Sequence, residues 1–327
     1  MKVGIIGMGA IGPIHINALL QRQQNIVALC DLDKEKCNKA NEKFALNAKI
    51  YTDYKQMLDE QCLDVVHICT PHYLHAEMIC EGLRRNINVL CEKPLAINME
   101  QIEEIEKVVQ KTTAQLGVCF QNHFNAAVLY VKDFLKDKEI KAASANLIWE
   151  RDAAYYAQAA WRGTWEQEGG GVMINQAIHG LDLLQWICGM PERVIAFTEN
   201  VALKNEIEVE DTAFGLFKLS NGRKFVVNAT NAAGYCFPIY YMFRAGADTV
   251  ELTANNIIIN GKFITKEDNL PIFGKEVWGV GHVKLIENFY DCLEKGEKFP
   301  IDFYEAQKVI RLILSMYKSK GKEIAII

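Results

Sequence analysis

The strongest constraint on the fold is a regular alternation of short apolar segments with amphipathic stretches over the first 120 residues. The apolar segments fit strands at residues 3–6, 26–30, 65–69, 87–91 and 116–120. Stretches of helical period separate them, at residues 11–21, 34–45, 53–59, 73–84 and 99–111. Strands that are apolar along their whole length are typical of a parallel sheet covered on both faces. Right-handed crossovers then predict a doubly wound α/β domain over residues 1–120.

The pattern changes after residue 121, where strand-like runs follow one another directly. A helix is expected at 126–135, a strand at 142–150 and a helix at 172–188. Six further strands are expected at 193–201, 212–219, 223–229, 239–244, 249–253 and 257–259, and two closing helices at 282–294 and 304–318. The Asn221-Gly222 pair is a hairpin signal. Residues 121–327 therefore predict an α+β domain with a large open, mostly antiparallel sheet.

A glycine-rich turn follows the first strand. The segment from Gly7 through Gly9, Ala10 and Ile11 to Gly12 has the spacing G-x-G-x-x-G and opens a helix. Such glycines permit a tight turn and let backbone N–H groups approach a pyrophosphate at the positive helix end. A structural glycine turn without a ligand is the alternative.

The residue that ends the second strand narrows the choice of cofactor. Asp31 lies 19 residues after Gly12, where a carboxylate can hold both ribose hydroxyls of a dinucleotide. Leu32 and Asp33 follow it, without the Ser/Arg pair that accommodates a 2′-phosphate. The sequence therefore favours NAD over NADP, although Lys34 and Lys36 are basic residues that could accept NADP.

Polar segments follow two of the predicted strands at their carboxyl ends, where ligands collect in an open α/β sheet. Thr70-Pro71 follows one strand and also fits a turn that starts a helix. Glu92-Lys93-Pro94 follows the next, and a partly desolvated Lys93 can exchange a hydroxyl proton near neutral pH. A surface lysine paired with Glu92 is an equal alternative at this point. For His75, helix packing or capping is favoured over catalysis.

Three glycines lead into the helix expected at 172–188. Asn175 and His179 are four residues apart and would share one face of that helix. Polar groups in line on an otherwise apolar helix indicate either a ligand site or a hydrogen-bonded core network, and the preceding glycines favour a site.

Composition excludes several classes of function. The formal net charge is −5, with both signs interspersed, which argues against nucleic acid as a partner. No apolar run approaches the ~20 residues of a membrane span, and a strand at residues 3–6 leaves no room for a leader, so we expect a cytoplasmic protein. The ten cysteines include no C-x-x-C pair, so reduced thiols are expected, with neither a disulfide framework nor a metal site.

The order of these motifs resembles the glucose–fructose oxidoreductase / inositol dehydrogenase / MocA family along essentially the whole chain. The residues that carry the resemblance are GMGAIG (7–12), Asp31, TPHYLHAE (70–77), CEKPLA (91–96) and GGGVMINQAIHGLDLLQW (169–186). The resemblance implies a Rossmann domain that binds NAD, followed by a substrate-binding domain whose open sheet forms a homodimer or homotetramer.

The resemblance also implies roles for individual residues. Lys93 and His179 would share a proton relay at the substrate hydroxyl, and Asn175, where many members carry Asp, would hold the sugar by hydrogen bonds. The residues expected beside the cofactor, in addition to the glycine turn and Asp31, are Thr70, Pro71, His75, Glu92, Lys93 and Gln121. The further residues expected beside the substrate are Asn122, Tyr156 and Arg162.

These features predict an NAD-dependent oxidoreductase acting on a secondary hydroxyl or keto carbon of a sugar, an inositol or a sugar derivative. The segments WRGTWEQEGGG (161–171) and IEVEDT (207–212) are similar to enzymes that oxidise a nucleotide-sugar uronate, whereas His123 and Ala126 depart from that subgroup. A free sugar, an inositol or a glycoside is at least as plausible a substrate. The alternatives are a non-catalytic NAD-binding sensor on the same fold and, with less support, a flavin enzyme.

Overall fold

The computed structural model describes residues 1–253, 256–266 and 280–327, which form two compact units. The first unit combines residues 1–121 with residues 280–307, and the second combines residues 122–266, as far as they are described, with residues 308–327. The units are therefore not two consecutive segments. Helix α9 (Gly281–Lys295), which the sequence pattern placed in the second domain, packs against α1 (Gly12–Gln21) of the first unit.

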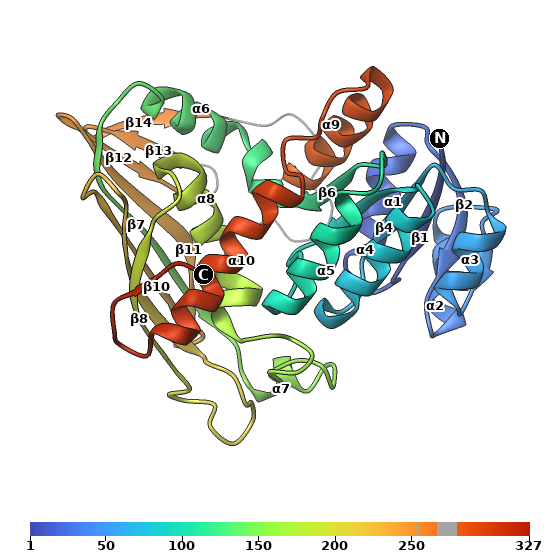
Figure 1. Ribbon diagram of the computed structural model, residues 1–327, viewed down its shortest axis with the longest axis horizontal. Helices are drawn as coiled ribbons and strands as arrows, with labels where there is room; N and C mark the ends of the chain where they lie inside the picture. The colour runs from blue at the N-terminus through green and yellow to red at the C-terminus, as the bar shows by residue number, and fades with distance from the viewer. Residues whose placement is uncertain (254–255, 267–279) are drawn as a thin grey trace. The chain divides into compact units, whose positions relative to one another are not determined.

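The first unit is built on a parallel sheet of six strands in the order β3-β2-β1-β4-β5-β6 (Figure 1). The strands are β1 (Lys2–Ile6), β2 (Asn25–Cys30), β3 (Lys49–Tyr51), β4 (Val65–Ile68), β5 (Asn88–Glu92) and β6 (Leu116–Cys119). The strand order reverses direction between β1 and β4, which is the switch point where doubly wound sheets bind ligands. The predicted Rossmann fold is thus confirmed. Strand β3 was not predicted, because three residues are too few to show a period.

Helices connect the strands of this sheet, as the periodicity predicted. They are α1, α2 (Lys34–Lys43), α3 (Tyr54–Glu60), α4 (His75–Arg84) and α5 (Met99–Val109), with short 3-10 turns at His72–Leu74 and Gln121–Phe124. Side chains cap three of them: Asp33 accepts from the N–H of Glu35, Asp53 from that of Lys55, and Asn98 from that of Gln101. Such caps satisfy backbone donors that the first helical turn leaves free.

The second unit is built on a nine-stranded sheet in the order β14-β13-β12-β11-β7-β10-β9-β8-β15, in which β7 and β10 run parallel and the other neighbours antiparallel. Its strands are β7 (Ile140–Glu150), β8 (Arg193–Glu199), β9 (Thr212–Lys218), β10 (Lys224–Thr230), β11 (Ala232–Ala245), β12 (Asp248–Leu252), β13 (Asn256–Ile259), β14 (Lys262–Thr265) and β15 (Ile324–Ala325). The predicted open, mostly antiparallel sheet is confirmed. Strands β14 and β15 were not predicted.

Helices cover one face of this sheet. Helix α8 (Ile178–Cys188) packs on β7 and β10, and α6 (Ala126–Leu135) packs on β12 and β13 (Figure 1). Phe217, Phe225 and Phe243 are fully buried on the sheet, and alternate residues of the same strands point the other way. Helix α10 (Phe303–Ser319) begins in the first unit and ends in the second. In the described part of the chain, no helix is long and apolar enough to cross a membrane.

Candidate functional site

The turn between β1 and α1 needs two of its glycines for folding and leaves the third beside open space. Gly7 has a φ of +95°, and a Cβ atom there would lie 2.5 Å from the carbonyl oxygen of Cys69. A Cβ atom on Gly12 would lie 2.5 Å from the carbonyl oxygen of Gly7. A Cβ atom on Gly9 would meet no atom of the described residues within 4 Å. Phosphate groups of a dinucleotide can therefore approach the backbone at Gly9, beside Ala10 and Ile11 at the helix start.

The carboxylate of Asp31 lies against this turn. Its Oδ2 accepts a hydrogen bond from the N–H of Met8 at 2.7 Å, and its Oδ1 accepts one from the N–H of Asp33 at 2.9 Å. The Nζ of Lys36 lies 3.9 Å from Oδ1. The carboxylate is therefore in the place where the ribose of a dinucleotide bound at the turn is recognised.

His75 ties together the two polar segments that follow β4 and β5. Its Nδ1 lies 2.7 Å from the carbonyl oxygen of Pro94, and its Nε2 lies 2.8 Å from that of Thr70. Burial lowers the pKa of His75, while the two carbonyl groups favour the charged ring. Because both ring nitrogens face backbone oxygens, His75 positions the segments that carry Pro71 and Lys93.

Lys93 is half-buried directly after β5, and its peptide bond to Pro94 is cis. The preceding side chain, Glu92, is buried in the first unit. Its Oε1 accepts a hydrogen bond from His15 Nε2 at 3.0 Å and lies 3.2 Å from His282 Nε2. Burial alone would raise the pKa of Glu92, but these two histidines hold it well below its usual value. The buried carboxylate thus anchors the backbone that carries Lys93.

The hydrogen-bonded network extends beyond Glu92. His15 Nδ1 lies 2.8 Å from His67 Nδ1, and His67 Nε2 lies 2.9 Å from the hydroxyl of Tyr290. Burial and the neighbouring His15 lower the pKa of His67 well below its usual value. Sequence analysis missed this network. The signal available in the sequence was a histidine inside each of two apolar segments, His15 and His67, which lie far apart in the chain.

The same network includes the group of described residues with the donor atoms of a metal site. His15, Glu92 and Cys119 offer a nitrogen, an oxygen and a sulfur atom within 4.8 Å of one another, all buried. Burial and the charge of Glu92 raise the pKa of the Cys119 thiol well above its usual value. A thiol that keeps its proton is a poor metal ligand, so this group fits a hydrogen-bonded core better than a metal site.

Gln121 and Asn122 follow β6 in a 3-10 turn. Gln121 is buried, and its Oε1 atom has no hydrogen-bond partner among the described residues. Asn122 is partly exposed, and its Oδ1 accepts from Asn125 at 3.5 Å. A buried acceptor without a protein partner is rare and indicates a missing ligand or water. Together with the open space at Gly9 and the carboxylate of Asp31, this acceptor fits a bound dinucleotide.

In the second unit, Asn175 belongs to a polar network at the segment that directly precedes α8 in the chain. Its Nδ2 donates a short hydrogen bond to Oε1 of the fully buried Glu168, whose Oε2 accepts from the N–H of Gly163. The same Nδ2 lies 3.4 Å from the hydroxyl of Tyr155. Gln176 Nε2 also approaches that hydroxyl, at 3.3 Å. The amide of Asn175 is thus held by a carboxylate that sequence analysis did not single out.

The helix that carries these residues differs from the prediction. Its first part, Met173–Ala177, is a π-helix, and the α-helix begins at Ile178. The buried carboxylate of Glu210 accepts hydrogen bonds from the N–H groups of Gly171 and Met173, at 2.9 and 3.0 Å, and so satisfies donors of this first turn. Asn175 and His179 therefore lie on different helix types, and their stacking cannot be taken from α-helical spacing.

His179 is half-buried near the start of α8. One turn further along, Asp182 is buried and pairs with His123, with 2.6 Å between Oδ2 and Nε2. The ring of His123 stacks on Trp186, with the ring centroids 3.9 Å apart. The carboxylate of Asp182 is therefore paired with His123 in the core. Asn175 and His179 are the polar residues of this helical segment that are partly exposed.

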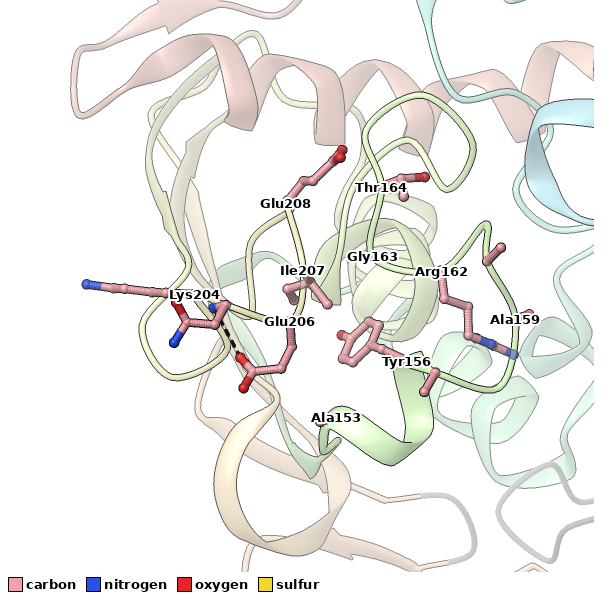
Figure 2. Close-up of a pocket in the computed structure, with 13 residues that line it drawn as sticks. Ala153, Tyr156, Ala159, Arg162, Gly163, Thr164, Lys204, Glu206, Ile207 and Glu208 are labelled. Carbon is pink, nitrogen blue, oxygen red and sulfur yellow. Dashed lines mark hydrogen bonds between the residues drawn. The ribbon is translucent and has the colours of Figure 1, made fainter.

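Tyr156 and Arg162 line a pocket of about 600 Å³ in the second unit (Figure 2). Tyr156 is buried in a small apolar cluster with Ile207 and Val209, and its hydroxyl accepts from Asn231 Nδ2 at 3.1 Å. Burial raises the pKa of Tyr156. The phenol of Tyr156 is thus a packed side chain, whereas Arg162 is partly exposed at the pocket.

Lys93 is carried by the first unit and His179, Asn175 and Arg162 by the second. A parallel doubly wound sheet, a glycine turn with open space at its middle glycine and an acidic residue after β2 define a dinucleotide-binding protein. Residues 1–120 match the family described as "Oxidoreductase family, NAD-binding Rossmann fold", and residues 130–244 match the "GFO/IDH/MocA C-terminal domain". The chain belongs to this NAD-binding oxidoreductase family.

Named relatives fall in the same family. The chain is 24% identical to myo-inositol 2-dehydrogenase of Thermotoga maritima over 239 residues, which cover 72% of this chain and 70% of the relative. The WlbA dehydrogenase of Bordetella pertussis, solved in complex with NADH and UDP-GlcNAcA, is similar with a TM-score of 0.88 and 27% identity, covering 100% of this chain and 98% of that one. The WlbA protein of Chromobacterium violaceum gives a TM-score of 0.89 and 28% identity, with 100% and 96% coverage.

Proposed function

We propose that the protein transfers a hydride between NAD and a secondary hydroxyl or keto carbon of a sugar, an inositol or a sugar derivative, nucleotide sugars included. The family and the dehydrogenases named above support this class of reaction. The observation that carries the proposal is the placement of Lys93. It follows β5 at the carboxyl edge of the sheet, and its neighbours Glu92 and Pro94 are fixed by His15 and His75.

In the proposed reaction, NAD supplies the hydride acceptor when it is bound. The Nζ of Lys93, in its neutral form, takes the hydroxyl proton as the substrate carbon loses its hydride, and it returns that proton in the reverse direction. His179 shares this relay. Asn175 cannot exchange a proton at neutral pH, so it holds the substrate by hydrogen bonding, with its side-chain amide oriented by Glu168.

Within this proposal the two parts of the chain have separate tasks. Residues 1–120 bind NAD through Gly7, Gly9, Gly12 and Asp31, with the residues after β4, β5 and β6 around the nicotinamide half. Residues 121–327 bind the substrate through Asn175 and the further side chains Asn122 and Arg162. The predicted contact of Tyr156 is limited to the pocket wall, because its ring is buried and its hydroxyl is bonded to Asn231. The ten cysteines are free thiols, which fits the reducing cytoplasm as the compartment.

We also propose that the protein is a homo-oligomer joined through the face of the second sheet opposite α6 and α8. On this face Phe197 of β8 pairs with Phe214 of β9, and their side chains are 60% and 44% exposed. Phe237, Met242 and Phe263 add further exposed apolar side chains on β11 and β14. Large exposed apolar side chains gathered on one sheet face are typical of a protein interface.

Substitution of Lys93 tests the catalytic proposal. The purified protein is first screened with NAD against sugars, inositols and sugar nucleotides, following NADH absorbance at about 340 nm. Lys93→Ala should then lower kcat by about 100- to 10,000-fold and leave the Kd for NAD little changed. His179→Ala should affect both kcat and KM, and Asn175→Ala mainly KM.

Three outcomes decide between the alternatives. Near-normal turnover by Lys93→Ala excludes Lys93 as the proton-transfer group. NAD binding without turnover of any compound in the screen favours the non-catalytic sensor. Absorbance near about 450 nm from the purified protein indicates a flavin instead of a nicotinamide cofactor.

A further inference from the structure

The side chain of Tyr155, which sequence analysis did not assign to a site, is surrounded by hydrogen-bond donors. It lies in α7 (Ala153–Tyr156), between β7 and the three-glycine segment. Its hydroxyl oxygen accepts from Arg162 Nη1 at 2.6 Å, from Gln176 Nε2 at 3.3 Å and from Asn175 Nδ2 at 3.4 Å. Three donors from two separate segments thus meet one phenolic oxygen.

In all three contacts the hydroxyl oxygen of Tyr155 is the acceptor, so none of them uses its hydroxyl proton. A phenol carries one proton and two acceptor sites, and neither a guanidinium nor an amide NH₂ group can accept a hydrogen bond from it. None of the described residues accepts a hydrogen bond from this hydroxyl. The side chain is partly exposed, so its proton can be donated to a molecule from outside the protein.

Two guanidinium groups flank the same ring. The Cζ of Arg162 lies 4.6 Å from the ring centroid of Tyr155 and that of Arg151 lies 4.8 Å from it. The Nε atoms of both arginines are buried and have no hydrogen-bond partner among the described residues. No carboxylate in the described part of the chain forms an ion pair with either arginine. A buried donor without an acceptor is costly, so each of these groups is suited to a ligand oxygen.

A buried carboxylate, that of Glu168, belongs to the same network, because Asn175 Nδ2 contacts both it and the hydroxyl of Tyr155. Glu168 is committed to the N–H of Gly163 and to Asn175. The donors around Tyr155 therefore amount to a phenolic O–H and two guanidinium groups, which are two positive charges beside the single carboxylate of Glu168. The complementary ligand group is an oxyanion, because planar guanidinium donors bind carboxylate and phosphate oxygens strongly.

We propose that Tyr155, Arg151 and Arg162 form an oxyanion-binding site that recognises a carboxylate or phosphate group on the substrate. This inference rests on the proposed function and narrows it to acidic sugars. Asn175 connects the site to the reaction, because the same amide that is proposed to hold the sugar contacts the hydroxyl of Tyr155.

Matched pairs of compounds test the inference by binding as well as by turnover. Calorimetric titration of the NADH-loaded protein would compare D-glucuronate with D-glucose, D-glucose 6-phosphate with D-glucose, and UDP-glucuronate with UDP-glucose. In at least one pair, the member with the added acidic group should bind about tenfold or more tightly than the member without it, as expected for a charge-assisted hydrogen bond. The pair that shows the preference distinguishes a carboxylate from a phosphate.

Substitutions then show which residues are responsible for the preference for acidic compounds. Arg162→Gln and Arg151→Gln should each reduce the acidic-to-neutral affinity ratio by about tenfold. Tyr155→Phe should reduce it by several-fold, and Arg162→Lys should restore part of it. Arg223→Gln is the matched control with an unchanged ratio. Arg223 precedes Lys224, which pairs with Ala142 near the start of β7, whereas Arg151 follows the other end of β7.

The outcomes separate this inference from the proposed function. Equal binding of the two members within every pair overturns the oxyanion site, even if a neutral sugar is oxidised. A preference that survives in Arg151→Gln and Arg162→Gln also overturns it. A preference that depends on these residues supports the site even if no compound is turned over, in which case the proposed function is the part that fails. Melting temperatures show which variants are folded, and Arg151→Gln carries the test if Arg162→Gln does not fold, because the one hydrogen bond described for the Arg151 side chain goes to the carbonyl oxygen of Glu150.

Discussion

Replacing Gly9 with alanine should abolish most NAD binding without weakening the fold. The added methyl group meets no atom of the described residues within 4 Å, and Gly9 does not have a positive φ. Gly→Ala at a compatible backbone position changes stability by about +0.4 to +1 kcal/mol through the unfolded chain. The melting temperature should therefore stay the same or rise by a few degrees.

The expected loss of affinity follows from what the methyl group displaces. Phosphate oxygens that approach the backbone at Gly9 would be pushed out of hydrogen-bond range. A hydrogen bond to a charged group contributes about 1.5–3 kcal/mol, so the Kd for NAD should rise by about 10- to 150-fold. Fluorescence or calorimetric titration with NADH measures this change, and differential scanning calorimetry measures the stability.

Gly7→Ala is the contrasting variant. Its φ of +95° and the 2.5 Å approach to the carbonyl oxygen of Cys69 make a side chain there incompatible with the fold. The left-handed backbone alone costs roughly 1–2 kcal/mol. Gly7→Ala should therefore lower the melting temperature, whereas Gly9→Ala should not. The reasoning is refuted if Gly9→Ala binds NAD with unchanged affinity, or if it destabilises the protein as much as Gly7→Ala does.

Three further predictions concern other parts of the chain. Asp31→Ser should lower the ratio of the Kd values for NADP and NAD by about tenfold or more, because it removes the negative charge facing a 2′-phosphate; titration with both dinucleotides checks this. Burial raises the pKa of Glu210 to about 7, so the folded protein keeps a proton that the unfolded chain has already released above pH 4.5. Its stabilising contribution is therefore complete below pH 4.5 and is lost as the pH rises through 7, by up to about 3 kcal/mol; urea unfolding from pH 5 to 8 should show this slope, and Glu210→Gln should remove it. Phe214→Glu should shift the protein towards the monomer in light scattering, because it places a charge in the proposed interface, and an unchanged oligomer would contradict the interface.

The fold could be predicted from sequence largely because its elements depend on local spacing. Alternation of apolar segments with helical periods predicted five of the six strands of the first sheet to within a residue or two at their ends. The G-x-G-x-x-G turn and Asp31 were placed correctly beside one another, because both follow directly from adjacent parallel strands β1 and β2. Strands β3 and β15 were missed, since elements of three and two residues carry no period.

The candidate site was only partly predictable, because its key contacts join distant parts of the chain. His15 meets His67 and Glu92 across 52 and 77 residues, and His67 meets Tyr290 across 223. The sequence did place Lys93 after β5, but it put Asn175 and His179 on one α-helix, whereas Asn175 lies in the preceding π-helix. The donors that surround Tyr155 and the carboxylates that hold Asn175 and the π-helix were invisible to it, since spacing along the chain reports only neighbours three or four residues away on a helix, or two away on a strand. What the sequence alone determined was the class of fold and the motif that binds NAD; the packing of helices and sheets alone decided which polar side chains are buried, which meet one another and which still face a ligand.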